Sequence, residues 1–112
     1  MTHIYKIMGR DEWAAAQAAG VYDGSAHDRR DGFIHFSTAE QAAETAAKHF
    51  AGRNDLLLLT IEMAGFGEAL KWEPSRGGAL FPHLYAPLPL DAVIAMRELP
   101  LGADGAHIFP PA

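Results

Sequence analysis

Residues 31–40 read Asp-Gly-Phe-Ile-His-Phe-Ser-Thr-Ala-Glu, and this stretch decides the fold because strand and helix signals meet within it. Gly32 allows the chain to leave a preceding loop, and the aromatic run 33–36 favours an extended strand. Side chains alternate across a strand, so the apolar Ile34 and Phe36 point to the same side. The stretch therefore predicts a short strand with one purely apolar face.

The other face of this strand carries the first candidate site residues. Phe33, His35 and Ser37 share it because they stand two residues apart. Ser37 followed by Glu40 has the pattern of a capping box, which predicts that a helix begins directly after the strand. His35 and Ser37 would then lie beside free N–H groups that favour anions. The competing interpretation is that His35 is a buried ring bonded to a backbone carbonyl.

Composition narrows the classes of function. The chain has 112 residues, 49% of them hydrophobic, which predicts one domain with a hydrophobic core. It has no cysteine, which predicts that it forms no disulfides and is located in the reducing cytoplasm. No signal-peptide pattern or membrane-length apolar run is present, so we expect a soluble protein without a membrane partner. The net charge of −5, without a basic patch, argues against nucleic-acid binding. Nothing in the sequence indicates the oligomeric state.

The hydrophobic pattern predicts an α+β domain. Alternation predicts a first strand over residues 2–8, followed by a short helix from its N-cap Asp11 to Ala19. An alanine stripe predicts a longer helix over residues 39–50. Residues 56–61 are apolar on both faces, as in a strand that is covered on both sides. We therefore expect this strand at the centre of the sheet, with the longer helix packed on it.

The remaining segments are punctuated by glycine and proline. Residues 21–31 hold turn residues without periodicity and predict a mobile surface loop. Further strands are predicted at 69–73, 79–85 and 92–99, and the prolines in and after 79–85 place that strand at an edge or in a loop. From about residue 100 a loosely held tail is expected, and the whole chain 1–112 is predicted to be a single domain.

A second face matches the first. If residues 79–85 are extended, Phe81, His83 and Tyr85 lie on one side. Each of the two faces thus offers an aromatic ring, a histidine and a hydroxyl group. Two such faces opposed across a cleft would hold a flat polar ligand.

Residues 71–78 supply further candidates. Trp72 offers a stacking surface, and Glu73 offers a carboxylate for a ribose hydroxyl or for general-base catalysis. Arg76 followed by two glycines could form an anion-binding nest of backbone N–H groups. The alternative for this stretch is a plain glycine-rich connector.

Two other chemistries lack support. The six histidines include no pair three or four residues apart, and there is no cysteine, so the sequence predicts no metal site and no required cofactor. A serine hydrolase is not indicated either, because Ser37 does not lie in a Gly-x-Ser-x-Gly turn.

Several strings together resemble the bacterial domain-of-unknown-function family 952. They are Ile4-Tyr5-Lys6-Ile7, Asp31-Gly32-Phe33-Ile34-His35-Phe36-Ser37, Leu70-Lys71-Trp72-Glu73, Ser75-Arg76-Gly77-Gly78 and Phe81-Pro82-His83-Leu84-Tyr85. The resemblance implies a small α+β fold similar to the ADP-ribosyltransferase fold, with a split mixed sheet and two helices around an NAD cleft.

The NAD-using RNA 2'-phosphotransferases are more distantly similar. They carry a His-x-Ser strand at the place of His35 and Ser37. Their first strand has a His-Gly-Thr segment that contacts NAD, where this chain has Lys6-Ile7-Met8. The resemblance therefore makes Lys6 a candidate for ligand binding.

The leading expectation is a domain that binds NAD or a related nucleotide and acts on it as a transferase or glycohydrolase. The expected catalytic residues are His35, His83 and Glu73, and the expected ligand-binding residues are Lys6, Ser37, Trp72, Arg76 and Tyr85. The alternative is a non-catalytic module for ligand binding or protein interaction that kept the fold.

Overall fold

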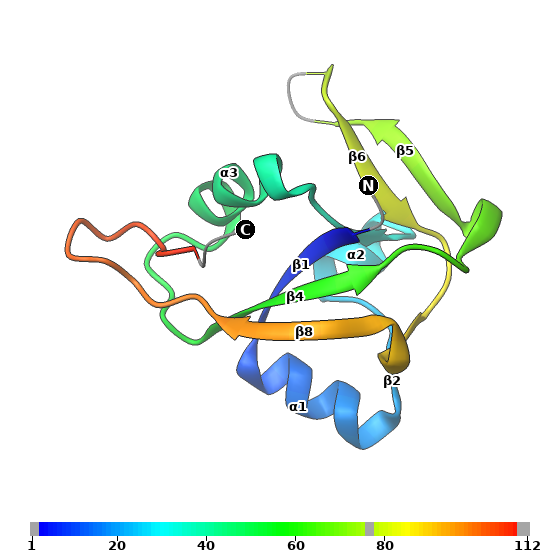
Figure 1. Ribbon diagram of the computed structural model, residues 1–112, viewed down its shortest axis with the longest axis horizontal. Helices are drawn as coiled ribbons and strands as arrows, with labels where there is room; N and C mark the ends of the chain where they lie inside the picture. Colours follow the sequence, from blue (N-terminus) through cyan, green and yellow to red (C-terminus); the bar gives the residue numbers. More distant parts are fainter. Residues whose placement is uncertain (1–2, 76–77, 110–112) are drawn as a thin grey trace.

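The computed structural model describes residues 3–75 and 78–109, which form one small α+β domain (Figure 1). In chain order the elements are β1 (His3–Gly9), α1 (Arg10–Ala19), β2 (Val21–Tyr22), α2 (Ala26–Asp31), β3 (Ile34–His35), α3 (Ala39–His49), β4 (Leu56–Glu62), β5 (Leu70–Pro74), β6 (Leu80–Leu84), β7 (Leu88–Pro89) and β8 (Val93–Glu98), with single 3₁₀ turns at Gly67–Ala69 and Leu90–Ala92. No helix in the described part of the chain has the length and apolarity needed to cross a membrane.

Two expectations about the architecture are wrong. The described strands pair only in antiparallel fashion, so the sheets are not mixed. The described residues also form three α-helices rather than two, because α2 lies within the segment expected to be a mobile loop. The sheet is divided, as expected, into β1–β4–β8, β3–β6–β5 and the short pair β2–β7.

Strand β4 is the centre of the first sheet, as predicted from its apolar faces. Leu57 and Leu58 point to opposite sides and are only 4% and 6% exposed. Leu57 belongs to the core cluster that includes Ala16 of α1, whereas Leu58 packs in a second cluster with Ala46 of α3. Figure 1 shows α1 and α3 on opposite sides of this sheet. The two helices therefore account for the double apolar pattern of β4.

Strand β6 corrects the expectation of an edge strand or a loop. It lies between β3 and β5, with Pro82 in its middle, opposite Trp72. Proline lacks only the backbone N–H, and the carbonyl of Pro82 still accepts a hydrogen bond of 3.0 Å from the Phe36 amide. A central position is thus compatible with this proline because its remaining polar group is paired.

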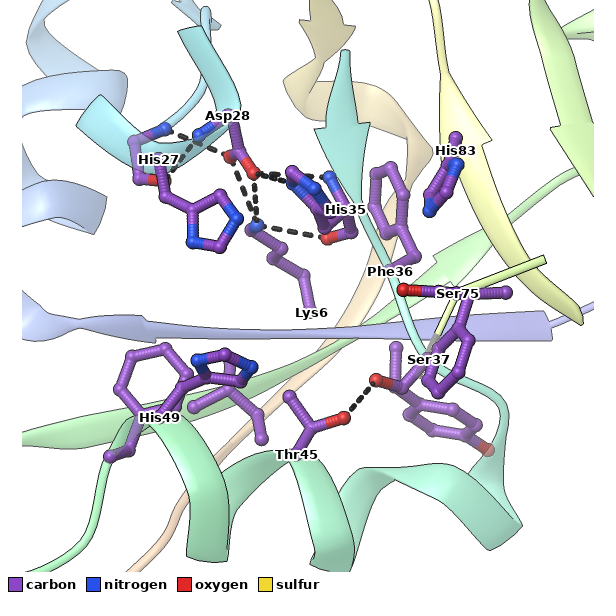
Figure 2. A pocket seen from close by; sticks show the side chains of 15 residues that line it. Lys6, His27, Asp28, His35, Phe36, Ser37, Thr45, His49, Ser75 and His83 are labelled. Carbon is purple, nitrogen blue, oxygen red and sulfur yellow. Dashed lines mark hydrogen bonds and ion pairs between the residues drawn. The ribbon is translucent and has the colours of Figure 1, made fainter. Parts of the chain in front are cut away.

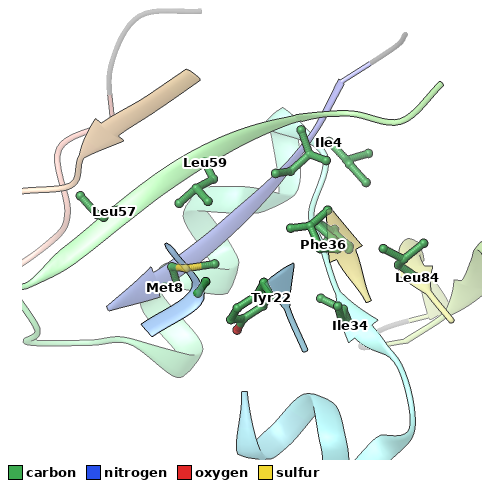
Figure 3. Packing of buried hydrophobic residues seen from close by; sticks show 11 residues of the cluster. Ile4, Met8, Tyr22, Ile34, Phe36, Leu57, Leu59 and Leu84 are labelled. Atoms are coloured by element: carbon green, nitrogen blue, oxygen red, sulfur yellow. The ribbon is translucent and has the colours of Figure 1, made fainter. Parts of the chain in front are cut away.

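The main core joins the two larger sheets. Ile34 and Phe36 are buried in it, as their shared face predicts, together with Ile4, Met8 and Leu84 (Figure 3). The backbones of the two sheets meet at one isolated bridge, where Tyr5 and Ser37 exchange N–H···O bonds of 2.8 and 2.9 Å. Beyond that bridge β1 and the β3 segment are no longer paired.

Both predicted N-cap residues are wrong by one or two positions, although α3 begins at Ala39 as predicted. The cap of α3 is Thr38, whose hydroxyl accepts from the Gln41 amide while the Gln41 side chain accepts from the Thr38 amide. The expected box of Ser37 and Glu40 does not form. Helix α1 is preceded by Gly9, because β1 extends to that residue, so Asp11 lies inside the helix.

Residues 101–109 are held more firmly than expected for the tail predicted from about residue 100. Leu101 pairs with His107 in an isolated bridge, and His107 is bonded through Nε2 to the Arg53 carbonyl at 2.7 Å. Phe109 packs against the second core cluster. Residues 101–109 therefore belong to the folded domain.

Candidate functional site

A cavity of about 110 Å³ opens where β1 and the β3 segment diverge, between α2, α3 and β6 (Figure 2). Its lining residues are Tyr5, Lys6, Ile7, Ser25, His27, Asp28, His35, Phe36, Ser37, Thr45, His49, Phe50, Ser75, Phe81 and His83. Aromatic and aliphatic side chains form walls, and histidines, hydroxyl groups and one buried ion pair supply the polar atoms.

Asp28 is the centre of the polar network, although it was expected in a mobile loop. Its side chain is only 2% exposed and accepts from Lys6 Nζ at 3.0 Å and from the Ser25 amide at 2.9 Å. The His35 amide donates to it at 3.1 Å, and His35 Nδ1 lies 2.6 Å from Oδ1. Lys6 Nζ also donates to the His35 carbonyl at 2.9 Å. The network thus ties β1, α2 and β3 together.

These contacts determine the charge state of Asp28. Burial alone raises the pKa of its carboxyl group, but the His35 hydrogen bond and the Lys6 charge outweigh burial and hold the pKa well below its usual range. Lys6, only 9% exposed, therefore faces an ionised partner. A buried ammonium group needs such a partner to remain charged.

His35 lies between two carboxylates. Its Nδ1 faces Asp28, and its Nε2 lies 2.9 Å from Oδ2 of Asp31. His27 Nε2 lies 3.1 Å from that same oxygen, and the rings of His27 and His35 meet edge to face. The His35 side chain is 27% exposed, so it is neither a fully buried core residue nor a free surface group.

A second histidine and carboxylate pair lies on β6 and β5. His83 Nδ1 is 2.8 Å from Oε1 of Glu73, and the Tyr85 hydroxyl donates to that oxygen at 2.7 Å. These hydrogen bonds, His83 first, lower the pKa of Glu73. Phe33 stacks on the His83 ring with centroids 4.1 Å apart. The His83 ring is therefore fixed in orientation.

The two histidines lie side by side on neighbouring strands of the second sheet, whereas the sequence predicted two faces opposed across a cleft. His35 and His83 are direct partners in the β3–β6 register, and their ring centroids are 5.3 Å apart. Each is oriented through Nδ1 by its own carboxylate, the arrangement by which enzymes fix the tautomer of an acid or base. Both rings line the cavity, so two oriented imidazoles border the same space.

The structure brings together only part of the predicted site. Lys6, His35, Ser37 and His83 line the cavity. Ser37 is buried and shares a 2.9 Å hydrogen bond with Thr45 of α3, instead of capping that helix. The predicted residues Trp72, Glu73 and Tyr85 do not line the cavity, and Arg76 lies outside the described residues.

Sequence reasoning missed His27, Asp28 and Asp31, all on α2. The sequence does contain a capping-box pattern, because Ser25 is followed three residues later by Asp28. Both reciprocal hydrogen bonds of this capping box form in the structure. His27, Asp31 and His35 also stand at equal spacings of four. The helix lacks an apolar stripe and is too short to show periodicity, so only these polar spacings could have revealed it.

Gly24→Ala tests how tightly α2 is held. Gly24 has a φ of +105°, and an added Cβ would lie 2.8 Å from the Asp28 Cβ. Gly32, with a φ of +90°, has open space at that position. We expect urea unfolding to show a loss of about 3 kcal/mol for Gly24→Ala and about 1 kcal/mol for Gly32→Ala, because only the first adds a clash to backbone strain. Equal losses would contradict the close packing of Gly24 on Asp28.

Comparisons with known proteins find solved structures that are similar to nearly the whole chain. The X-ray crystal structure of protein CC0527 from Caulobacter crescentus is 56% identical to this chain, with a TM-score of 0.91 over 96% of this chain and 94% of that one. A solution NMR structure of CC0527 is 57% identical, with a TM-score of 0.85 over 95% and 91% of the two chains. Among curated proteins no match is found. The model of the family described as "Protein of unknown function (DUF952)" matches residues 7–96. This chain therefore belongs to the DUF952 family.

Proposed function

We propose that the protein binds NAD or a related nucleotide, with one ring of the ligand in the cavity, and acts on it as a transferase or glycohydrolase. The observation that carries the proposal is the convergence of His35 and His83 on one cavity between the two sheets. A likeness to the ADP-ribosyltransferase fold belongs to this proposal and is supported by the divided sheet. The proposal also includes a cytoplasmic location, which is supported by the absence of cysteine.

The size of the cavity limits what it can hold. Its volume of about 110 Å³ is somewhat below that of the ~150 Å³ cavity known to take up benzene. The enclosed space therefore holds at most part of one flat ring, and the rest of that ring and its substituent would lie at the open mouth of the cavity. The phosphates and the second nucleoside of a dinucleotide would lie outside, along the cavity mouth. Phe36, Phe50 and Phe81 supply the apolar walls for such a ring.

The histidine pair supplies a route for chemistry. In hydrolysis of NAD, water attacks the ribose carbon that bears nicotinamide, the C–N bond breaks, and nicotinamide leaves as a neutral molecule. His83, oriented by Glu73, would accept the proton that the water loses. In transfer, an acceptor hydroxyl takes the place of water. No further proton donor is required, because the leaving group departs with the bonding electrons.

The second candidate is a non-catalytic binding module, and one observation favours it. Lys6 is the only lysine or arginine among the described lining residues, and Asp28 and the His35 carbonyl already engage its ammonium group. A ligand phosphate therefore finds no uncommitted cation in the described lining. A neutral ring bound without reaction would fit this arrangement as well.

Isothermal titration with NAD, ADP-ribose and nicotinamide tests the proposal. At least one compound should bind with a Kd between about 1 µM and 1 mM, or roughly −8 to −4 kcal/mol. Thr45→Phe, which fills the cavity from α3, should weaken binding at least tenfold. Ala43→Phe, on an exposed position of the same helix, should leave binding unchanged.

Chromatography of the same mixtures separates the two candidates. Release of nicotinamide from NAD by the wild-type protein, and its loss in Thr45→Phe, would support catalysis. Binding without release would leave the non-catalytic module. Absence of heat with all three compounds would contradict nucleotide binding.

A further inference from the structure

Three potential metal-ligating side chains converge at the rim of the cavity. One ligand atom from each of His27, Asp31 and His35 lies within 4.8 Å of the others, the only such group among residues 3–75 and 78–109. Oδ2 of Asp31 is 3.1 Å from Nε2 of His27 and 2.9 Å from Nε2 of His35. Figure 2 shows the two histidines side by side at one end of the cavity. Asp31 comes from the last turn of α2, and the αL turn at Gly32 brings the chain back to His35.

The hydrogen-bond inventory of His35 points to a cation. A neutral imidazole carries a single N–H, yet each ring nitrogen of His35 faces a carboxylate oxygen. A single N–H cannot serve both oxygens, and His27 Nε2 approaches the same oxygen of Asp31. A metal ion between the two Nε2 atoms and Oδ2 satisfies all three groups with neutral rings.

We propose that His27 Nε2, Asp31 Oδ2 and His35 Nε2 bind a divalent transition-metal ion such as Zn²⁺. Bonds of about 2.0–2.2 Å in tetrahedral geometry place ligand atoms about 3.3 Å apart. The separations of 2.9 and 3.1 Å from Asp31 Oδ2 need to open by a few tenths of an ångström, and the two histidine nitrogens, which lie within 4.8 Å of each other, need to approach to about the same ~3.3 Å. Two imidazoles and one carboxylate suit Zn²⁺ and its first-row neighbours better than Mg²⁺ or Ca²⁺, which prefer oxygen ligands.

A supporting carboxylate for this site is already in place. Metal-bound histidines usually donate their other N–H to a carboxylate, which fixes the ring. His35 Nδ1 stands 2.6 Å from the buried Asp28 in that manner. Asp28 is in turn held by Lys6 and by the Ser25 amide. The ligand that lies closest to the core is therefore the one most firmly oriented.

The site leaves room for a further ligand. The side chains of His27 and Asp31 are 45% and 36% exposed, and both histidines also line the cavity. Three protein ligands with one open position are typical of catalytic rather than structural zinc. This inference revises the expectation of no metal, because the spacing rule for histidine pairs does not detect a carboxylate between two histidines. It stands independently of nucleotide binding.

Calorimetric titration of chelator-treated, dialysed protein with Zn²⁺ tests the site. One ion per chain should bind with a Kd of about 10 µM or tighter. His27→Ala and Asp31→Asn should each weaken binding at least tenfold, by analogy with the 10–100-fold effects of residues that only support a ligand. Both side chains are on the surface, so these variants should fold, and far-ultraviolet circular dichroism checks that they do.

His3→Ala is the matched control. His3 Nε2 lies 3.7 Å from Glu62 Oε2 and is 41% exposed, so it forms a surface histidine and carboxylate pair outside the proposed site. Its replacement should leave Zn²⁺ affinity within twofold. Binding of Co²⁺ should give visible absorption that His27→Ala abolishes. The proposal is overturned if Zn²⁺ does not bind, or if His27→Ala and His3→Ala have the same effect. The Zn²⁺ titration contains no nucleotide, so failure of the metal-site proposal is distinguishable from failure of the proposed function.

Discussion

Asp28→Asn is expected to cost about 3–5 kcal/mol of unfolding free energy, the scale for removing one partner of a buried ion pair. Asparagine keeps the size of the side chain but removes its charge. Lys6, 9% exposed, then keeps a buried ammonium group without an ionised partner, and the amide nitrogen cannot accept from the donor it faces, which is His35 in one orientation of the amide and Ser25 in the other. Urea unfolding followed by circular dichroism measures the loss. A cost below about 1 kcal/mol would mean that water reaches Lys6 readily.

The Lys6→Met variant shows whether the ion pair is the cause. Methionine fills a similar volume without charge, so the double variant Lys6→Met/Asp28→Asn contains no buried unpaired ammonium. The double variant should lose less stability than the sum of the single variants, by about 0.5–3 kcal/mol, because the two side chains are in contact. Strict additivity would argue against direct coupling.

Leu59→Ala is expected to cost about 2–5 kcal/mol, because the side chain is 0% exposed at the centre of the first sheet. The cavity that it leaves cannot collapse easily between two neighbouring strands. Met96 provides a matched control, since it is the direct partner of Leu59 on β8 but is 47% exposed. Met96→Ala should change stability by less than about 1 kcal/mol. Similar losses for both variants in urea unfolding would contradict the central position of β4.

Features with a local and regular pattern could be predicted from the sequence. The two apolar faces of residues 56–61 placed β4 at the sheet centre, and the alternation in 33–36 placed Ile34 and Phe36 in the core. The same alternation placed His35 and His83 each on the polar face of its strand, but these faces lie side by side on neighbouring strands and do not oppose each other across a cleft, as was expected. An alternating pattern predicts which side chains are buried, because burial of one strand face fixes the pairing register.

Features that depend on distant contacts could not be predicted. Ser37-x-x-Glu40 and Thr38-x-x-Gln41 both fit a capping box, and the choice between them follows from the backbone bridge of Ser37 to Tyr5. Helix α2 depends on Asp28, whose partners lie on β1 and β3. Its polar surface gives no hydrophobic signal, so the segment looked like a loop. The proposed metal-ligand group was missed for another reason, because a carboxylate lies between its two histidines and no pair of histidines has the expected spacing.

The strand pairing also determines when the protein can fold. In β1, which precedes the other described strands, His3 pairs with Glu62, and in β2 Val21 pairs with Pro89. A growing chain that ends before β4 therefore exposes the apolar side chains of β1 with no partner strand. Long-range pairing of this kind costs the entropy of closing a large loop before the paired strands make any stabilising contact. This cost slows folding and favours aggregation of incomplete chains. The domain can assemble only once nearly all of its sequence has left the ribosome.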